Sequence, residues 1–266
     1  MKKKIITLTT DFGEGSFYEA ILNGKLMTAL PNATIISITN NITKFDIRET
    51  AFVLRSSYKS FPEGTIHIIG VQTEISDSIP LVAMLYDKQY FISADNGILS
   101  LISCGKQDKI LKFNTLSDTV NNFMSFVEST SAFASAIVNG DTENIASPVS
   151  SFSNELIDLS PTVIDNELHG QVIYIDSYSN AVVNITKEAF QEFVKDKKFF
   201  INVKSRNAQI DMISKTYTDI GSKNDIEGRL LAIFGCHGYL EIAMCYSNVS
   251  QLLGIEKGSP VTVSLV

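Results

Sequence analysis

The sequence predicts an α/β fold in two parts: an N-terminal domain built on a parallel sheet, and a C-terminal β-barrel or β-sandwich domain. Three observations lead to this prediction. Strand-like and helix-like segments alternate early in the chain, short β runs with polar turns follow residue 167, and a stretch rich in Ser, Pro, Asn and Asp at Ser147–Asn166 separates the two patterns. We therefore expect an α/β domain at residues 1–160 and a β-barrel domain at residues 167–266.

The N-terminal domain starts with an apolar, threonine-containing strand and continues in β-α-β-α-β order. Apolar residues at helical spacing, ended by Pro31, predict the first helix, and a turn at Pro62–Gly64 ends the second. This order favours parallel strands joined by right-handed helical crossovers. The expected strands are 5–10, 33–38, 65–69, 81–86 and 89–92, and the expected helices are 17–30, 47–61, 98–102 and 126–138.

The C-terminal domain contains short β runs separated by polar turns, with one helical segment between them. Several short strands of this kind are typical of a small sandwich or barrel. The expected strands are 171–175, 181–185, 198–203, 228–234, 241–246 and 261–266, and the expected helix is 187–194.

Composition excludes several classes of protein. The formal net charge of −7 argues against a nucleic-acid partner, because phosphate binding needs a basic face. No segment approaches the ~18 continuous apolar residues of a membrane span, and the N-terminus does not resemble a signal peptide. The three cysteines, Cys104, Cys236 and Cys245, fit a reducing compartment, so we expect a cytoplasmic protein. With three histidines and no C-x-x-C or H-E-x-x-H motif, we expect neither a metal site nor a resident cofactor.

The first candidate functional residue is Asp11, which follows the first strand. The segment Thr10–Gly15 lacks the G-x-G-x-x-G pattern, so a nicotinamide or flavin site is unsupported, and no G-x-S-x-G elbow occurs. Open parallel sheets bind ligands at the carboxyl ends of their strands, and a carboxylate there can accept hydrogen bonds from both hydroxyls of a ribose. The alternative is that Asp11 caps the following helix, a role that Ser16 can also fill.

Two further polar turns leave alternatives open. Asp95-Asn96-Gly97 is a turn signature first and a site second. The segment Asp176–Asn180 lies between two β runs and is either a hairpin loop or a ligand-reading loop, in which Asn180 offers both a donor and an acceptor to an adenine edge. His67 lies in an apolar strand, which indicates a core histidine rather than a ligand.

Taken in order, these motifs resemble one protein family. The N-terminal part contributes Thr9-Thr-Asp-Phe-Gly13, Tyr18, Gly24, Phe61–His67 and Asp95–Gly97, and the C-terminal part contributes Ile175-Asp-x-Tyr-x-Asn180, Gly238–Ala243 and Leu253-Gly254 with Gly258. The set is similar to the S-adenosyl-L-methionine (SAM) hydroxide adenosyltransferases, which form adenosine and are related to the fluorinase and chlorinase.

The resemblance implies a homotrimer in which SAM lies between the N-terminal domain of one subunit and the C-terminal domain of its neighbour. It implies that Asp11 grips the ribose, Asp176 holds the methionine amino group, Tyr178 and Asn180 sandwich and read adenine, and His237 contacts the methionine carboxylate. The other substrate-binding residues that it implies are Phe12, Ser16, Phe126 and Ala243.

The implied chemistry is an SN2 attack on the ribose C5′ with methionine as the leaving group. The family activates the attacking water with an Asp, an Arg and a His. In this sequence the Asp position holds Gln72, the Arg position holds Ser78 or Ile79, and the His position holds Val127. The usual water-activating residues are therefore expected to be lost.

Glu74 and Glu128 are new carboxylates in or near the expected pocket, and together with Gln72 they are the candidate catalytic residues. A buried Glu can act as a general base, whereas the alternative is that both side chains face solvent. Two functions follow: a divergent adenosyltransferase that still cleaves SAM, or a catalytically silent homologue that binds SAM or adenosine. Retention of Asp11, Asp176 and Asn180 argues against a third reading, a trimeric scaffold without a ligand.

Overall fold

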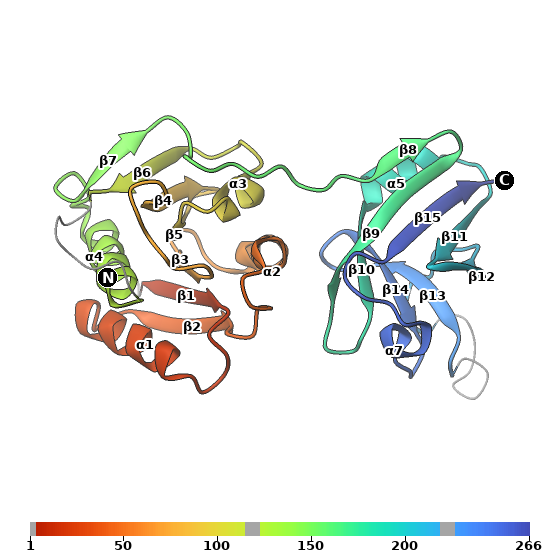
Figure 1. Cartoon of the computed structure of the whole chain (residues 1–266), viewed down its shortest axis with the longest axis horizontal. Coiled ribbons are helices and arrows are strands. Elements are labelled where there is room, and N and C mark those ends of the chain that lie inside the picture. Colours follow the sequence, from red (N-terminus) through yellow and green to blue (C-terminus); the bar gives the residue numbers. More distant parts are fainter. Residues whose placement is uncertain (1–3, 115–122, 219–226) are drawn as a thin grey trace. The chain divides into compact units, whose positions relative to one another are not determined.

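The structure, a computed structural model, describes residues 4–114, 123–218 and 227–266 (Figure 1). The chain divides into two compact units, Met1–Asp158 (unit 1) and Leu159–Val266 (unit 2), which are described separately below. Each unit has its own apolar core. Within the described ranges, no helix has the length and apolar character needed to cross a membrane.

Unit 1 is built on a seven-stranded sheet with the order β2-β1-β3-β5-β4-β6-β7. Strands β2, β1, β3 and β5 run parallel, whereas β4, β6 and β7 pair antiparallel with their neighbours. The expected α/β fold is confirmed, and the sheet is mixed rather than parallel throughout. The strands are β1 (Ile5–Thr10), β2 (Thr34–Thr39), β3 (Ile66–Gly70), β4 (Leu81–Tyr86), β5 (Gln89–Ala94), β6 (Lys109–Phe113) and β7 (Ala146–Val149).

The reversal of direction begins at the turn between β4 and β5. Asp87 and Lys88 have φ angles of 49° and 60°, which is the left-handed pair that a two-residue type I′ hairpin needs. Strands β6 and β7 were not among the expected elements. Strand β7 is an edge strand containing Pro148, which pairs in register with Leu111, and an edge is where a strand tolerates proline.

Helices cover both faces of this sheet (Figure 1). Leu22 of α1 and Phe133 of α4 share one core cluster, and Leu54 of α2 and Leu101 of α3 share another. The second expected helix ends earlier than the spacing indicated, because its last turn is a 3₁₀-helix. The elements are α1 (Phe17–Ala29), α2 (Ile47–Ser57), η1 (Tyr58–Ser60), α3 (Ile98–Ser103) and α4 (Phe123–Asn139).

A polar cluster lies inside unit 1 around His67 of β3, whose ring is fully buried. The Nδ1 atom of His67 is 2.7 Å from the Thr7 hydroxyl, and its Nε2 atom is 2.8 Å from the side-chain oxygen of Gln89. An amide oxygen only accepts, so Nε2 carries the proton and Nδ1 accepts from Thr7. Burial lowers the pKa of His67 to about 4, so the ring is neutral, and the expectation of a core histidine is confirmed.

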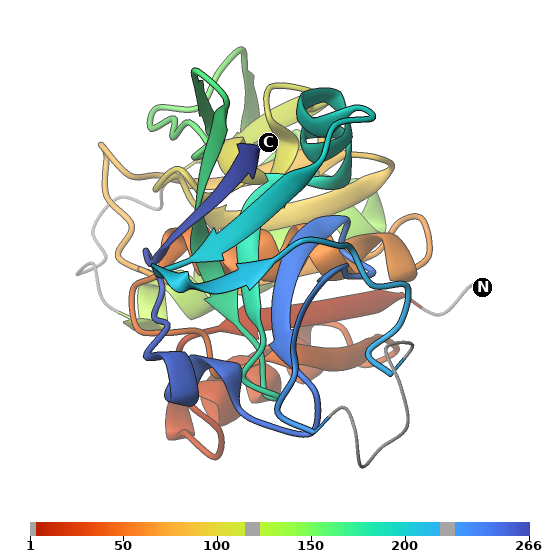
Figure 2. The same ribbon diagram turned by 90° about the vertical axis from the view of Figure 1, so that its right-hand side faces the viewer.

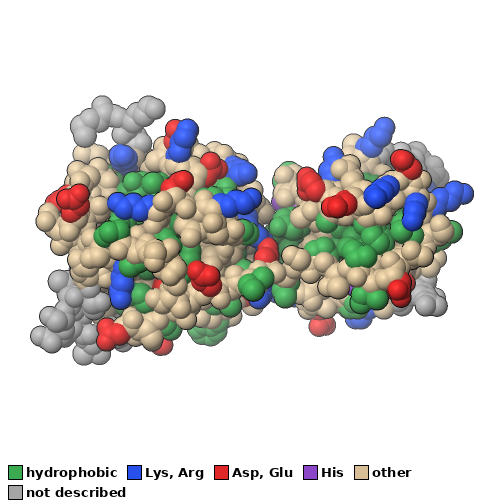
Figure 3. All heavy atoms as spheres, turned by 90° about the horizontal axis from the view of Figure 1, so that it is seen from above, with side chains coloured by type: hydrophobic (Ala, Val, Ile, Leu, Met, Phe, Trp, Pro, Cys, Tyr) green, Lys and Arg blue, Asp and Glu red, His purple; other side chains and the backbone are tan. Residues whose placement is uncertain are grey.

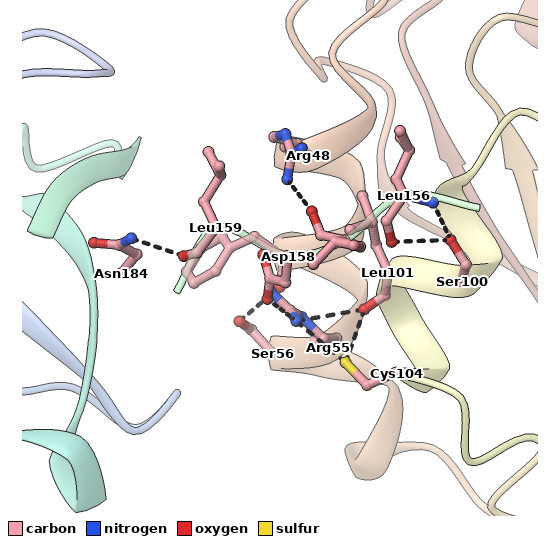
Figure 4. Close-up of polar contacts among 12 residues, drawn as sticks. Arg48, Arg55, Ser56, Ser100, Leu101, Cys104, Leu156, Asp158, Leu159 and Asn184 are labelled. Carbon is pink, nitrogen blue, oxygen red and sulfur yellow. Dashed lines mark hydrogen bonds and ion pairs between the residues drawn. The ribbon is translucent and has the colours of Figure 1, made fainter. Parts of the chain in front are cut away.

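The segment that leaves unit 1 is held against it by polar contacts (Figure 4). The backbone N–H of Leu156 donates to Ser100 Oγ at 2.9 Å, Arg48 donates to the carbonyl of Ile157 at 3.0 Å, and Arg55 forms an ion pair with Asp158. The next residue, Leu159, belongs to unit 2, and its carbonyl accepts from Asn184 Nδ2 at 2.7 Å. Each unit therefore fixes its own end of the connecting segment.

Gly97, which caps α3, allows this segment to pack closely. Its φ is +98°, and a Cβ atom there would lie 2.5 Å from Leu156 Cγ. We expect Gly97→Ala to lower the free energy of unfolding by about 2 kcal/mol, through backbone strain and displacement of Leu156. Gly105→Ala is the matched control, because Gly105 has φ +76° with nothing within 4 Å, and should cost about 1 kcal/mol. Equal losses in urea unfolding would contradict the role of Leu156.

Unit 2 is an antiparallel sheet with the order β12-β11-β15-β9-β10-β14-β13, to which β8 adds by pairing with β9. A bridge between Ile213 and Ala232 brings the two ends of the order together, so the sheet nearly closes into a barrel, as expected (Figure 2). The strands are β8 (Thr162–Ile164), β9 (Glu167–Ile175), β10 (Ala181–Thr186), β11 (Phe199–Val203), β12 (Ser205–Ile210), β13 (Leu230–Phe234), β14 (Tyr239–Met244) and β15 (Pro260–Leu265), and the helices are α5 (Lys187–Val194) and α7 (Val249–Leu253).

Candidate functional site

Polar residues follow the parallel strands of unit 1 at their carboxyl ends. Asp11 follows β1, Asn40 follows β2, Gln72 lies just beyond β3, and Asp95 follows β5. The Thr10 hydroxyl donates to Asn40 Oδ1 at 2.9 Å. Because these strands are parallel neighbours, their carboxyl ends lie along one edge of the sheet, the edge at which such sheets bind ligands.

Asp11 is 8 % exposed and is oriented by the segment that precedes α2. Its Oδ2 atom accepts from the backbone N–H of Phe45 at 2.9 Å, and its backbone carbonyl accepts from the Lys44 ammonium. Among the described residues, Oδ1 has no hydrogen-bond partner. Ser16 caps α1 by accepting from Tyr18 N at 3.3 Å. Asp11 is therefore not the N-cap of α1, and one of its carboxylate oxygens is available to a ligand.

Gln72 contacts the main chain of Phe45 from the side opposite Asp11. The sequence did not identify Phe45 as a site residue. Its Nε2 atom donates to the Phe45 carbonyl at 3.0 Å, so Asp11 and Gln72 fix the main chain of Phe45 from both sides. Phe45 has a left-handed φ of 65°, and the residue is 68 % exposed. The only sequence feature that could have pointed to Phe45 is its position directly before Asp46, the N-cap of α2.

Aromatic rings gather around Phe12, the residue that follows Asp11. The ring centroid of Phe12 is 5.4 Å from that of Phe123, which in turn is 4.7 Å from that of Tyr18, and Phe17 lies against Tyr18. Phe12 also lies close to Gly70, where a Cβ atom would be 2.8 Å from the Phe12 ring. Such rings can stack on a planar group or receive a cationic ligand over their faces.

The other candidates of unit 1 are distributed differently. Gln72 and Glu74 are exposed in the segment after β3. Glu128 is exposed on α4 and lies 3.4 Å from Lys25 of α1 in an ion pair. Phe126 has no exposed surface and packs in the core. The structure thus brings Asp11, Phe12, Ser16 and Gln72 to one edge, and places Phe126 inside unit 1.

Asp95 anchors the connecting segment. It is 2 % exposed, and its Oδ2 atom accepts from Ser153 N at 2.6 Å. Burial raises the pKa of this carboxyl, and the hydrogen bonds from Ser153 oppose that rise. Asn154 donates to both the Asp95 and the Ser78 carbonyls. The segment Asp95–Gly97 is therefore a structural turn, as its composition first indicated.

In unit 2, the loop Asp176–Asn180 joins β9 to β10. Asp176 Oδ1 accepts from the backbone N–H groups of Tyr178 and Asn180, both at 2.8 Å, and Oδ2 accepts from Asn180 Nδ2 at 3.0 Å. Asp176 thus organises its own loop as an Asx turn. Asn180 is 8 % exposed, whereas Tyr178 is 80 % exposed.

The outer side of β14 carries a second polar group. Leu240 and Ile242 point into the barrel core, so the alternation of a strand puts Glu241 and Ala243 on the other side. Glu241 is nevertheless only 4 % exposed. The Tyr217 hydroxyl donates to Glu241 Oε1 at 2.5 Å, and His237 Nε2 lies 3.5 Å from Glu241 Oε2.

Tyr217 and Glu241 were missed by sequence reasoning as site residues. Burial raises the pKa of the Tyr217 phenol above its usual range, and the hydrogen bond to Glu241 and the negative charges of Glu241 and Asp176 act in the same direction. Asp176, Tyr217 and Glu241 therefore share one electrostatic environment. The signal available was an acid alternating with apolar residues in Tyr239–Ala243. Over the described parts of the chain, no group of three or more His, Cys, Asp or Glu side chains could hold a metal ion.

The fold and the candidate site define a two-unit protein: an α/β unit with the oriented carboxylate of Asp11 at the carboxyl edge of its sheet, and a unit built on a nearly closed antiparallel sheet. Residues 6–143 match the SAM hydroxide adenosyltransferase N-terminal domain, and residues 170–262 match the corresponding C-terminal domain. The chain belongs to the SAM hydroxide adenosyltransferase family, which confirms the resemblance found in its motifs.

The similarity to known proteins extends over nearly the whole chain. The (R)-S-adenosyl-L-methionine hydrolase of Methanocaldococcus jannaschii is 23% identical over 259 residues, which are 95% of this chain and 92% of the relative. An uncharacterised conserved protein from Thermotoga maritima has a TM-score of 0.82 at 23% identity, covering 98% of this chain and 99% of its own. A conserved hypothetical protein from Thermus thermophilus has a TM-score of 0.73 at 20% identity, with both chains fully covered. These two structures share the fold.

Proposed function

We propose that this protein hydrolyses SAM to adenosine and methionine. The observation that carries the proposal is the geometry of Asp11, a mostly buried carboxylate at the carboxyl end of β1 with one oxygen fixed by Phe45 N–H and the other available. That geometry suits the two hydroxyls of a ribose. Family membership supplies the substrate class, and the relative from M. jannaschii is named for hydrolysis of the (R) form of SAM.

In this reaction the oxygen of water forms a bond to C5′ as the C5′–S bond breaks. The electron pair of that bond goes to sulfur, so the sulfonium becomes the neutral thioether of methionine, and the proton lost by water goes to a base or to solvent. When the proton leaves before the attack, the negative charge of the hydroxide and the positive charge of the sulfonium cancel in the transition state, which a dry pocket favours. Asp11 would contribute by fixing the ribose, and therefore C5′, relative to the water.

The roles of the remaining residues are part of the proposal. Asp176 would hold the methionine amino group, Tyr178 and Asn180 would contact adenine, and His237 would lie at the methionine carboxylate. Gln72, Glu74 and Glu128 are the proposed water-handling residues. Phe12, Ser16, Phe126 and Ala243 complete the proposed substrate-binding set, with Phe126 supporting it from the core.

We further propose a homotrimer that joins unit 1 of one subunit with unit 2 of the next. Phe45 and Tyr178, one in each unit, are 68 % and 80 % exposed, and a neighbouring subunit would cover both. Apolar side chains also reach the face of each unit seen in Figure 3. Native mass spectrometry should give about three times the 29.3 kDa chain mass. We also propose a cytoplasmic location, since none of the three cysteines forms a disulfide.

The test is turnover in water labelled with oxygen-18, with separate (R) and (S) sulfonium epimers of SAM as substrates. We expect adenosine to carry the label at its 5′ oxygen and methionine to carry none, because water attacks C5′. Glu74→Gln and Glu128→Gln in the same assay identify the base by loss of the labelled product. Binding of SAM by calorimetry without any product above the spontaneous rate would replace hydrolysis with the silent ligand-binding function.

A further inference from the structure

Glu241 is a buried carboxylate to which the proposed reaction assigns no role. It lies on the outer side of β14 among apolar neighbours, since Leu231, Ile233, Ala243 and Cys245 form one buried cluster on strands β13 and β14 and just beyond. Strand register pairs Glu241 with Ile233 on one side and Val182 on the other. A hydrophobic side chain of similar volume at such a position is often as stable as a buried charge or more so. Stability alone therefore does not explain the glutamate.

One carboxylate connects three parts of unit 2. Its Oε1 atom accepts from the Tyr217 hydroxyl, its Oε2 atom faces His237 Nε2, and its backbone belongs to β14. Tyr217 is tied to the same strand a second time, because Cys245 Sγ lies 2.8 Å from the Tyr217 carbonyl. Glu241 thus fixes an aromatic ring from the segment after β12 and an imidazole from the turn before β14.

The same contacts determine the tautomer of His237. The backbone N–H of Tyr239 donates to His237 Nδ1 at 3.1 Å, so Nδ1 is the acceptor nitrogen. In a neutral imidazole the proton is then on Nε2, the atom that faces Glu241. The ring also lies so close to Gly235 that a Cβ atom there would be 2.6 Å from His237 Nε2 and 3.1 Å from Glu241 Oε2. The absence of a side chain at Gly235 therefore provides the space that the ring and the carboxylate occupy.

The arrangement adjoins the residues expected to meet the ligand in unit 2. Ala243 is on the same side of β14 as Glu241, and Ala181, which follows Asn180, pairs in register with Ile242. We propose that Glu241 is a positioning residue of the substrate site: it holds Tyr217 and the Nε2-protonated form of His237 in place before the ligand binds. This inference rests on the proposed function and adds a residue to it. When the two side chains are already ordered, binding of the ligand does not include the entropic cost of ordering them. Glu241 is therefore expected to affect the affinity for the ligand.

The first experiment is kinetic and uses the full-length protein. We expect Glu241→Leu to raise KM for SAM by about tenfold to thirtyfold with kcat changed by less than about threefold, because ring order is lost but no reacting atom is touched. Glu241→Gln keeps an oxygen and a donor for the two rings and should recover most of the affinity. Tyr217→Phe removes only one of the two contacts and should have an intermediate KM.

The second experiment needs no ligand. The chain has three histidines, His67, His169 and His237, so a nitrogen-15 histidine-labelled sample gives three ring patterns, which His237→Gln and His169→Gln assign. We expect the wild-type His237 ring to show a protonated Nε2 and an unprotonated Nδ1. The Nε2–H signal should be lost to solvent exchange in Glu241→Leu, and retained but shifted in Glu241→Gln, because a neutral amide replaces the carboxylate that it faces.

The outcomes separate this inference from the proposed function. Unchanged KM and an unchanged His237 ring signal in folded Glu241→Leu would overturn it. If Glu241→Leu does not fold, Tyr217→Phe with wild-type KM and Glu241→Gln with an unshifted Nε2–H would overturn it instead. If the wild-type protein neither binds nor hydrolyses SAM, the proposed function fails, and the ring signals alone still decide whether Glu241 positions His237.

Discussion

Replacing Asp11 with asparagine lowers kcat/KM for SAM by about a hundredfold or more, which is the largest effect that we expect from one atom's change in this protein. Asparagine can still accept the Phe45 N–H at its oxygen, so the loop before α2 keeps its place. The amide NH₂ then points where the free carboxylate oxygen was and meets the ribose hydroxyls donor to donor. Hydrogen bonds to a charged group contribute about 1.5–3 kcal/mol each, and two of them account for this factor.

The control for this prediction removes the same charge from the same turn. Glu14 is an exposed neighbour, and Glu14→Gln should leave kcat/KM within about threefold of the wild-type value, because a surface charge of this kind contributes little. Steady-state formation of adenosine measures both variants, and thermal unfolding checks that Asp11→Asn is folded. A folded Asp11→Asn protein with the activity of Glu14→Gln would remove Asp11 from the site.

The free energy of unfolding of unit 1 falls by about 3 kcal/mol through His67 alone as the pH falls from about 6.5 to 4. Burial holds the pKa of His67 at about 4 in the folded protein, whereas the unfolded chain takes up the proton near pH 6.5. Proton binding therefore favours the unfolded state throughout this window. The contribution of the neutral ring is complete above the unfolded pKa and disappears as the pH falls to the folded pKa.

Urea unfolding at a series of pH values measures this contribution as a difference between variants. His67→Gln keeps hydrogen-bonding groups for Thr7 and Gln89 but cannot be protonated, so we expect it to be less stable at pH 7 and to have a shallower slope between pH 6.5 and 4. His169, with 37% of its side chain exposed, is the second histidine to replace, and the slope of His169→Gln is measured in the same series for comparison. A wild-type slope in His67→Gln would show that other groups dominate the acid response.

The parts of the fold that the sequence predicted are those with local signals. Helical spacing ended by Pro31 and the cap candidate Ser16 are features of neighbouring residues, and α1 begins where they indicate. The order and direction of the strands could be predicted less well from the sequence. The Asp87-Lys88 turn has no Asn or Gly to signal its left-handed backbone, so the antiparallel half of the sheet was missed. Strand β7 was missed because Pro148 argues against a strand everywhere except at an edge.

For the candidate site, too, the residues with local sequence signals were predicted and those that depend on distant contacts were not. Asp11 was predicted from its place after a strand, and its alternative role was excluded once Ser16 was seen to cap α1. Phe45 and Tyr217 were not predicted, because their contacts with Asp11 and Glu241 join residues 34 and 24 positions apart. No periodicity in a single sequence reports such pairs. The roles of Gln72, Glu74 and Glu128 depend on the substrate position and stay predictions.

Pro148 has a consequence for how copies of this protein meet. An open sheet edge can recruit the edge of another molecule, and repeated addition of that kind produces fibrils. Strand β7 lies at one end of the unit 1 sheet, and its proline lacks the N–H that an incoming strand would need at that position. Continuous growth of the sheet through this edge is therefore disfavoured. The trimer proposed above would then form through side-chain surfaces rather than through this edge.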